Sequence, residues 1–517
     1  MPSAADLIFV AILGVLLLTP LSVKLLNDAG IGWHIRDGQQ ILSAHAIPRV
    51  DPFSSQIRKP WIAWEWLYDV IVGRLETSAG LNGVVWFAAI VIAATFALLF
   101  RLLLRRGADF LAALVLTLLA ISASMIHFLA RPHVLSWLFV VVWFWILQAT
   151  DRSRRLWLLP ALMLLWANLH GGFLLGFVLL GAFWVESVWT WLRSNPLRIE
   201  DSLEGIAAGK RAWQLTLVGL ASPLATFVNP YGWSLHEHIY SYLTNRFFMD
   251  HIDEFQSPNF HGIAQKCFLA LLLIAVATLV ARVRRLKLRE ILLLMFAIFA
   301  ALFASRNIPV SSVLLVLIVG PLIPSLALAP LSRKMHAVDT KMKGHLWPIV
   351  AAVAAVVVAL HDGRVGSTQL MDAHFDPQRM PVGAVNFIEA HEARAVALHA
   401  PIFSEIPQCR ASGPLASPDY WGGYLIYRLY PNNTVTVDDR HDFYGEWLMR
   451  RYLTIMHLEP GWEKTVEWGG CLILPRTAPL SAVLGKMPAW KRVYSDDVAT
   501  VFVDTSVHED RDKVPSR

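Results

Sequence analysis

Long apolar runs restrict the fold of this chain more than any other feature of its sequence. A helix needs about 20 apolar residues to cross roughly 30 Å of hydrocarbon. We identify eleven candidate spans with little or no charge, at residues 7–26, 81–100, 110–130, 134–150, 156–168, 172–192, 212–228, 263–281, 291–304, 308–330 and 346–361. The sequence therefore predicts a polytopic α-helical membrane protein with about 11 transmembrane helices.

The composition supports this class of protein and excludes several others. Of the 517 residues, 56% are hydrophobic and only 16% are charged, whereas an average soluble domain has roughly 25% charged residues. With 3 Cys against 21 Trp and 26 Phe, the chain is neither a disulfide scaffold nor a disordered or collagen-like protein. The formal charge of +6 comes from basic residues between apolar runs, where membrane topology accounts for them, so we exclude nucleic-acid binding.

The basic residues also predict the orientation of the chain, because Lys and Arg in short loops remain on the cytoplasmic side of a membrane. Every second loop is basic; the sets are Arg101, Arg105 and Arg106, then Arg152, Arg154 and Arg155, then Arg193, Arg198, Lys210 and Arg211, then Arg282, Arg284, Arg285, Lys287 and Arg289, and finally Arg333, Lys334, Lys341 and Lys343. This alternation places the N-terminus in the cytoplasm and the region after residue 361 outside. The first run lacks a basic n-region and a cleavage site, so we interpret it as an anchor. We expect a multi-pass protein of the bacterial inner (plasma) membrane.

The stretch 156–192 tests this count of spans. Both of its flanks are basic, so it must cross the membrane twice. Its one break is Asn168-Leu169-His170-Gly171-Gly172, where paired glycines relax the backbone and favour the turn of a helical hairpin. The first arm is short for a span, so we expect it to lie inside the protein.

Hydropathy falls from residue 362 onward, and this change divides the chain. We predict a transmembrane domain at 1–361, with a long first extracytoplasmic loop at 27–63, and a small α/β extracytoplasmic domain at 362–517. In that domain, strands are predicted at 395–398, 434–437, 471–474, 491–494 and 499–503, and helices at 382–390 and 480–486. Cys409 and Cys471 both lie there, and the sequence leaves open whether they form a disulfide.

Ionisable groups in or beside membrane spans are costly, and by default they indicate function. Here they gather at the predicted extracytoplasmic ends of the spans. The set comprises Asp28, His34, Asp51 and Glu65 from the first loop, His127, Arg131 and His133 after the third span, Asn168 and His170 at the hairpin tip, Asn229, His236, His238, Asp253 and Glu254 after the seventh span, and Arg306 after the ninth. The sequence therefore predicts an acidic, histidine and arginine cluster on one membrane face.

The first loop has features of an interfacial segment. It contains an amphipathic piece at 35–44 and is followed by Trp61, Trp64, Trp66 and Tyr68, which are aromatic residues typical of the headgroup level. Asp28 follows the first span directly, and the glycines next to it allow the backbone to approach a ligand closely. Such a loop suits a substrate with a lipid tail and a polar head.

The layout of one span, a long extracytoplasmic loop opening with an acidic residue, further spans and a C-terminal extracytoplasmic domain resembles the GT-C glycosyltransferases, which use polyprenyl-phosphate sugars. Most of the chain also resembles a group of uncharacterised bacterial GT-C-like membrane proteins. The segments that carry the resemblance are 28–38, Ile47-Pro48-Arg49-Val50-Asp51-Pro52-Phe53-Ser54, Glu65-Trp66-Leu67, Arg131-Pro132-His133, Trp166-Ala167-Asn168-Leu169-His170-Gly171-Gly172, Asn229-Pro230-Tyr231-Gly232, Trp421-Gly422-Gly423-Tyr424-Leu425 and Val437-Asp438-Asp439-Arg440. The chain departs from the family at Asp28, where no Asp-x-Asp or Asp-Glu pair stands.

The resemblance implies an inverting hexosyl or pentosyl transfer at the outer face, from a polyprenyl-phosphate sugar to a glycan, lipid or protein acceptor of the cell envelope. Asp28 is the expected base, with Asp51 and Glu65 as further catalytic candidates, because a carboxylate can take the proton of an attacking hydroxyl. Arg131 or Arg306 is the expected partner of the leaving phosphate. The remaining candidates for binding substrate are His34, His133, Asn168, His170, Asn229 and Glu254. No cofactor is certain, and a divalent metal is optional.

Other interpretations of these residues remain open. The protein could be a lipid or solute transporter or flippase, or a catalytically inactive GT-C-like assembly protein for envelope polysaccharide. Locally, Asp28 could cap the next helix, and the segments at 422–423 and 438–440 could be strand and turn architecture. The transferase hypothesis predicts that Asp28, Arg131, Arg306 and His170 meet in one cavity open to the outer leaflet.

Overall fold

The computed structural model describes residues 1–55, 60–148, 153–194, 199–323, 328–342, 344–397, 409, 414–465 and 470–504. The chain forms two compact units. Unit 1 comprises Met1–Leu21 and Val85–Met371, and unit 2 comprises Ser22–Val84 and Asp372–Arg517. The segment 22–84, which includes the first loop, is therefore part of the same unit as the C-terminal region. The predicted division of the chain after residue 361 stays a prediction.

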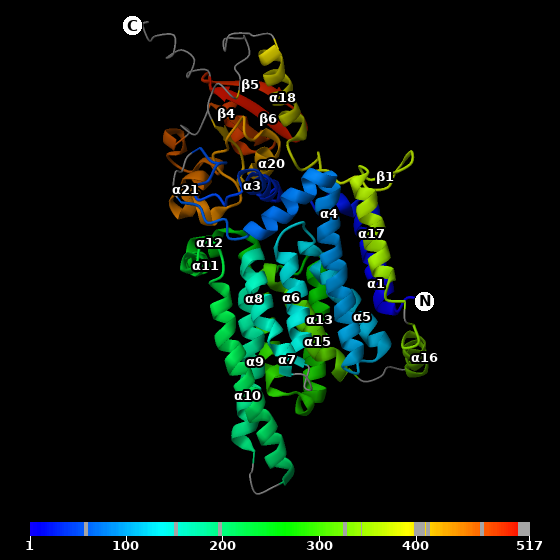
Figure 1. Cartoon of the computed structure of the whole chain (residues 1–517). Coiled ribbons are helices and arrows are strands. Elements are labelled where there is room, and N and C mark those ends of the chain that lie inside the picture. Colours follow the sequence, from blue (N-terminus) through cyan, green and yellow to red (C-terminus); the bar gives the residue numbers. More distant parts are fainter. Residues whose placement is uncertain are drawn as a thin grey trace. The chain divides into compact units, whose positions relative to one another are not determined.

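Unit 1 is helical. Its helices are α1 (Ala4–Leu18), the second part of α4 (Trp66–Arg105), α5 (Phe110–Ser124), α6 (His133–Gln148), α7 (Ser153–Leu156), α8 (Leu158–Leu169), α9 (Leu174–Arg193), α10 (Ile199–Thr226), α11 (Trp233–Thr244), α12 (Arg246–His251), α13 (Ile263–Arg282), α14 (Leu288–Phe303), α15 (Ile308–Val319), α16 (Ala329–Asp339) and α17 (Trp347–Leu360). A two-stranded ribbon, β1 (Arg364–Val365) and β2 (Thr368–Gln369), follows them. Helix α10 lies along α8 and α9 (Figure 1).

Five helical segments in the described part of the chain are long and apolar enough to cross a membrane: Trp66–Arg105, Phe110–His127, Gly171–Arg193, Ile263–Arg282 and Ser305–Leu322. Three shorter apolar helices are α1, α6 and α17. The chain is therefore a multi-pass membrane protein of mostly helical structure. The count of about 11 spans stays a prediction, because several of the predicted spans form shorter helices.

Local sequence explains where these helices break. The predicted break at the hairpin is present, since α8 ends at Leu169 and α9 begins at Leu174. Helix α4 contains a kink at Ala79 and Gly80, where Gly80 has φ +57°. A positive φ is accessible to glycine without steric cost, and the boundary between the two units follows after Val84.

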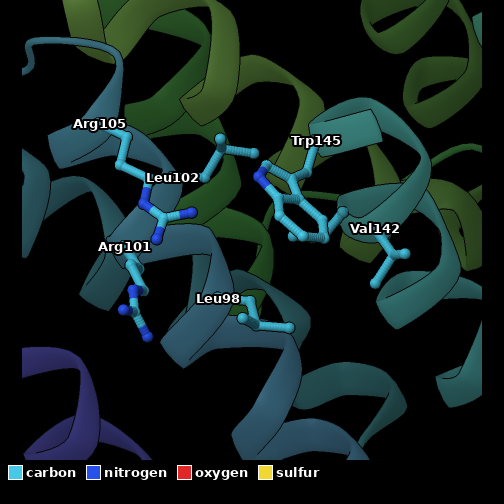
Figure 2. A pocket seen from close by; sticks show the side chains of 7 residues that line it. Leu98, Arg101, Leu102, Arg105, Val142 and Trp145 are labelled. Carbon is cyan, nitrogen blue, oxygen red and sulfur yellow. The ribbon is translucent and has the colours of Figure 1, made fainter. Parts of the chain in front are cut away.

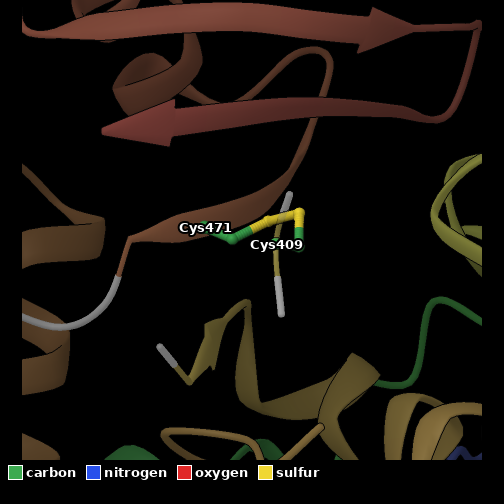
Figure 3. The surroundings of a disulfide bond; sticks show 2 residues. All are labelled: Cys409 and Cys471. Atoms are coloured by element: carbon green, nitrogen blue, oxygen red, sulfur yellow. A yellow bond between two sulfur atoms is a disulfide. The ribbon is translucent and has the colours of Figure 1, made fainter. Parts of the chain in front are cut away.

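Unit 2 combines helices with a small sheet. Its elements are α2 (Leu21–Lys24, which starts at the unit boundary), α3 (Ile31–Ala44), the first part of α4, α18 (Val382–Ala397), β3 (Leu415–Ala416), α20 (Asp419–Leu429), α21 (His441–Met456), β4 (Cys471–Pro475), α22 (Pro479–Leu484), β5 (Trp490–Ser495) and β6 (Ala499–Asp504). The four strands have the order β3-β4-β6-β5; β3 is parallel to β4, and the other pairs are antiparallel. Helix α18 packs beside β5 and β6. Cys471 in β4 forms a disulfide with Cys409 (Figure 3).

Several predictions for this region are wrong. Residues 395–397 belong to helix α18 and not to a strand, while Leu398 lies outside the described residues. Residues 434–437 form no strand, and Val435 makes only isolated bridges to Ser54 and Leu415. The predicted strands at 471–474, 491–494 and 499–503 and both predicted helices are confirmed.

Glycines determine how α3 packs in unit 2. A Cβ on Gly38 would overlap the carbonyl oxygen of Asp69 in α4, and a Cβ on Gly32 would overlap that of Gly423 in α20. Gly422 and Gly423 lie inside helix α20, so the expected strand or turn at 422–423 is wrong. Gly32 allows two backbones of the protein to meet, and not the backbone and a ligand as the sequence suggested.

Candidate functional site

Five predicted site residues form a charged group in unit 1, which we call the unit 1 cluster: Arg131, His133, His170, Glu254 and Arg306. They come from the turn before α6, the start of α6, the break between α8 and α9, the 3₁₀ turn Asp253–Phe255 and the 3₁₀ turn Ser305–Asn307. Glu254 interacts electrostatically with Arg306, His133 and Arg131, and His170 with His133, Arg306 and Arg131. The fold therefore brings together residues that are up to 175 positions apart in the sequence (Arg131 to Arg306).

The centre of the unit 1 cluster is an ion pair. Arg306 lies 3.3 Å from Glu254, and the two side chains are 29% and 43% exposed. Backbone bonds connect their turns, since Ser305 N donates to Gln256 O at 2.9 Å. Burial acts to raise the pKa of Glu254, but the nearby charge of Arg306 and those of the histidines and Arg131 lower it below the ordinary value. Glu254 is therefore ionised at neutral pH, and the pair remains accessible to water.

The hydrogen bonds of His170 determine which of its ring nitrogens carries a proton. The Gly172 backbone N–H donates to His170 Nδ1 at 3.0 Å, and the Ser136 hydroxyl lies 2.7 Å from the same nitrogen. Trp166 Nε1–H donates to Ser136 Oγ at 2.8 Å, so the hydroxyl proton of Ser136 is directed to His170. Because Nδ1 accepts these bonds, neutral His170 carries its proton on Nε2.

Two other candidates, together with His133 of the unit 1 cluster, hold the surrounding backbone. Asn168 donates to Leu164 O at 2.8 Å and to Val228 O at 2.9 Å. Asn229 closes the turn after α10 by donating to Thr226 O at 2.7 Å and by accepting from Tyr231 N at 2.7 Å. The His133 ring donates from Nε2 to His127 O at 2.9 Å. These contacts fix the loops that carry the unit 1 cluster.

The acidic candidate Asp51 lies in the interior of unit 2. Arg440 donates to Asp51 at 2.7 Å and to Asp438 at 2.6 Å, and the side chain of Arg440 is only 3% exposed. The guanidinium carbon lies within 5.5 Å of the ring centroids of Trp33, Phe53, Trp61 and Phe443. Burial lowers the pKa of Arg440, but Asp438 and Asp51 outweigh that effect and raise it. The predicted turn at 438–440 thus contains the central residue of a buried network.

His34 and Glu65 belong to a second buried group in unit 2. His34 Nδ1 lies 2.5 Å from Asp69, and Nε2 lies 3.8 Å from Glu65. Asp37 is fully buried one turn further along α3, and burial raises its pKa to about 7 against the lowering effect of Asp69 and Arg440. The sequence had not singled out Asp37; its place inside the segment 28–38, beside the packing glycine Gly38, was the available signal.

Asp28 differs from these buried acids. It is half-buried, and its Oδ1 accepts from Gly30 N at 2.9 Å, immediately before α3. Asp28 belongs to unit 2, whereas Arg131, Arg306 and His170 belong to unit 1. The predicted common cavity therefore stays a prediction.

Trp61 and Tyr68, which we expected at the headgroup level, are 4% and 1% exposed and pack inside unit 2. In the described ranges, no group of three or more His, Cys, Asp or Glu side chains is arranged to hold a metal ion. We therefore assign no metal ligands.

The comparisons with known proteins reveal similarity in fold. No protein-family model and no curated protein sequence matches this chain. The oligosaccharyltransferase AglB of the archaeon Archaeoglobus fulgidus, solved with an inhibitory peptide and a dolichol-phosphate, has 10% identity and a TM-score of 0.52, with 99% of this chain and 74% of that chain covered. The A. fulgidus oligosaccharyltransferase tethered to an acceptor peptide with the NVT sequon has a TM-score of 0.54 and 10% identity. The match covers 97% of this chain and 74% of that chain. The apo form of the oligosaccharyltransferase has a TM-score of 0.51 and 10% identity, with 91% of this chain and 68% of that chain covered. The predicted resemblance to the GT-C type is confirmed at the level of the fold.

Proposed function

We propose that this protein is an integral membrane glycosyltransferase of the GT-C type, which transfers a sugar from a polyprenyl-phosphate carrier to an acceptor of the cell envelope. The observation that carries the proposal is the unit 1 cluster, in which arginines and histidines surround a partly exposed ion pair. The neighbouring fold supports the lipid carrier, because AglB was solved with a dolichol-phosphate. Its structure with an acceptor peptide supports a separate acceptor.

The residues present suit the reaction. An acceptor hydroxyl attacks the anomeric carbon, the bond from that carbon to the phosphate oxygen breaks, and the phosphate leaves with the electron pair; a single displacement inverts the configuration. Arg131 and Arg306 bind the leaving phosphate, because guanidinium groups match phosphate oxygens in shape and charge. His170 Nε2–H supplies a further donor. When the phosphate binds, it replaces Glu254 as the anionic partner of Arg306.

Asp28 is the proposed base. Among the three catalytic candidates it is the one that is only half-buried, whereas Asp51 and Glu65 are 7% exposed. An exposed carboxylate can accept the proton of the attacking hydroxyl. Asp51, Glu65 and His34 then support the shape of unit 2.

Topology forms part of the same proposal. The N-terminus lies in the cytoplasm of a bacterial cell, and unit 2 lies on the extracytoplasmic side, where an oxidising compartment allows the Cys409–Cys471 disulfide to persist. A reporter fusion at His170 tests this orientation. Cytoplasmic reporter activity would contradict it.

The direct test is the identity of the lipid that co-purifies with the full chain. We expect a polyprenyl phosphate, identified by mass spectrometry of the extracted lipid, and we expect Arg131→Gln with Arg306→Gln to lose it. Arg246→Gln is the matched control, because Arg246 is 93% exposed and pairs only loosely with Asp250 at 3.8 Å. Absence of polyprenyl phosphate from the wild-type protein, or retention in the double variant, would refute the lipid-binding role.

The chemical role of Asp28 needs its own experiment. Asp28→Asn should abolish transfer of labelled sugar from polyprenyl-phosphate sugars in membranes, with expression and lipid binding intact. Full activity of this variant would remove Asp28 as the base. A variant that binds the lipid normally but transfers no sugar separates catalysis from binding.

A further inference from the structure

A pocket in unit 1 lies away from the proposed site. It has a volume of about 230 Å³ and is lined by Leu98, Arg101, Leu102, Arg105, Val141, Val142 and Trp145. The two arginines come from α4, one turn apart, and Val142 and Trp145 come from α6 (Figure 2). The pocket thus has basic groups at one end of an apolar wall.

The arginines of this pocket have no acidic partner among the residues that the structure describes. Within the described residues, neither Arg101 nor Arg105 forms an ion pair or a hydrogen bond. Arg101 and Arg155 both interact electrostatically with Arg105 as like charges. In contrast, the next residue Arg106 pairs with Glu290 at 2.7 Å. Arg105 therefore lies near two like charges, and an anion bound beside it would relieve this repulsion.

The apolar part of the pocket faces outward. Leu98 and Trp145 are each 40% exposed, and the Arg155 guanidinium lies 5.6 Å from the Trp145 ring centroid. Tryptophan and arginine side chains together are typical of the headgroup level of a bilayer, where one end is apolar and the other polar. A lipid chain along Leu98 and Val142 would leave its headgroup beside the arginines.

We propose that this pocket binds the phosphate headgroup of an anionic phospholipid, with Arg101 and Arg105 as phosphate donors, Arg155 at the rim and Trp145 against the glycerol and first acyl carbons. Basic pockets between membrane helices bind anionic headgroups in this way. The pattern of basic loops predicts that this end of the helices faces the cytoplasm, where anionic lipids are concentrated. The site is separate from sugar transfer and does not depend on it.

The test uses the full chain in detergent, with phosphatidylglycerol, phosphatidylcholine and inorganic phosphate as probes. Native mass spectrometry should detect bound phosphatidylglycerol, and Arg101→Gln with Arg105→Gln should lower its occupancy at least about tenfold, as expected for the loss of two charge-assisted contacts. Equal binding of phosphatidylcholine would refute the anionic specificity. Displacement of the lipid by inorganic phosphate would refute the lipid as the ligand.

Matched variants separate binding from folding. Arg193→Gln is the charge control, because Arg193 also lies at the end of a membrane helix and stacks over a tryptophan, Trp189, at 5.0 Å. Its phosphatidylglycerol binding should match that of the wild type, and an equal loss would point to nonspecific charge. Leu98→Trp fills the pocket without changing charge and should also reduce binding. Unchanged binding in this variant would place the lipid elsewhere.

Discussion

Arg440 in unit 2 and Arg306 in unit 1 both pair with carboxylates, but their surroundings differ. Arg440 is 3% exposed, contacts two carboxylates within 2.7 Å and is enclosed by aromatic rings. Arg306 is 29% exposed, and its partner Glu254 is 43% exposed at 3.3 Å. A closed network leaves no room for a ligand, whereas a looser pair in contact with water can exchange its anion. The difference shows that the charges of this network are buried in unit 2, whereas those of the unit 1 pair stay in contact with water, as the proposed role of unit 1 in binding phosphate requires.

The largest expected effect is the loss of Arg440. Arg440→Met leaves Asp51 and Asp438 buried without their cation, and breaking one side of a buried pair costs about 3–5 kcal/mol. Thermal unfolding followed by tryptophan fluorescence should report it through Trp33 and Trp61, which contact Arg440. Arg450→Gln is the control, since Arg450 and Glu446 are 60% and 45% exposed and such a pair contributes less than about 1 kcal/mol. Equal stability of the two variants would contradict the comparison.

The pH dependence of unit 2 should follow Asp37. Its folded pKa of about 7 lies above that of the unfolded chain, so the folded state retains the proton between about pH 4 and 7 and stability falls as pH rises through this range. Asp37→Asn removes this loss and should stabilise the protein at pH 8, by on the order of 4 kcal/mol at most.

Measurement at two pH values tests the assignment. The groups that act on the charge of Asp37, namely Asp69, Asp51 and Arg440, are present in both proteins. The advantage of Asp37→Asn in thermal unfolding should shrink from pH 8 to pH 5. An advantage independent of pH would refute the role of Asp37.

Close backbone packing gives the next effect. Gly38→Ala forces a Cβ against the backbone of α4 and should destabilise unit 2 by about 1–3 kcal/mol, as overpacking does. Gly14→Ala is the counterpart in unit 1, where no atom lies within 4 Å of the added Cβ. It should leave the unfolding temperature unchanged or raise it. A tolerated Gly38→Ala would show that α3 and α4 separate easily.

The smallest effect on stability is expected at Glu254. Glu254→Gln removes a partly exposed pair that contributes less than about 1 kcal/mol, so thermal unfolding should hardly change. In the proposed function Glu254 competes with phosphate for Arg306, so polyprenyl phosphate retention should increase severalfold. Since its pKa is lowered, the wild-type pair should persist from pH 8 to pH 5. A large stability loss would assign Glu254 to the structural class of Asp51.

The sequence alone determined the membrane class, because apolar runs near the length of a bilayer leave few other folds, and it located the break at His170 and three strands of unit 2. From their place beside apolar runs it also singled out Arg131, His133, His170, Glu254 and Arg306, which the fold brings together; their role stays a prediction. Local pattern failed at 395–397, 422–423 and 434–437, where the packing of distant segments outweighs residue preference. Gly32 packs against Gly423, and Asp51 pairs with Arg440. Each of these pairs joins residues that are almost 400 positions apart in the sequence, so no local signal predicts them.

Only the tertiary structure decided which acids are buried and which stay in contact with water. Asp28, Asp51 and Glu65 are equivalent carboxylates in the sequence of one loop, but burial depends on what covers them after folding. Asp51 is covered by Arg440 and its aromatic neighbours, whereas Asp28 stays half-exposed at the start of α3. Desolvation and pairing are properties of the assembled interior, and they separate structural charge from charge that is available to a substrate.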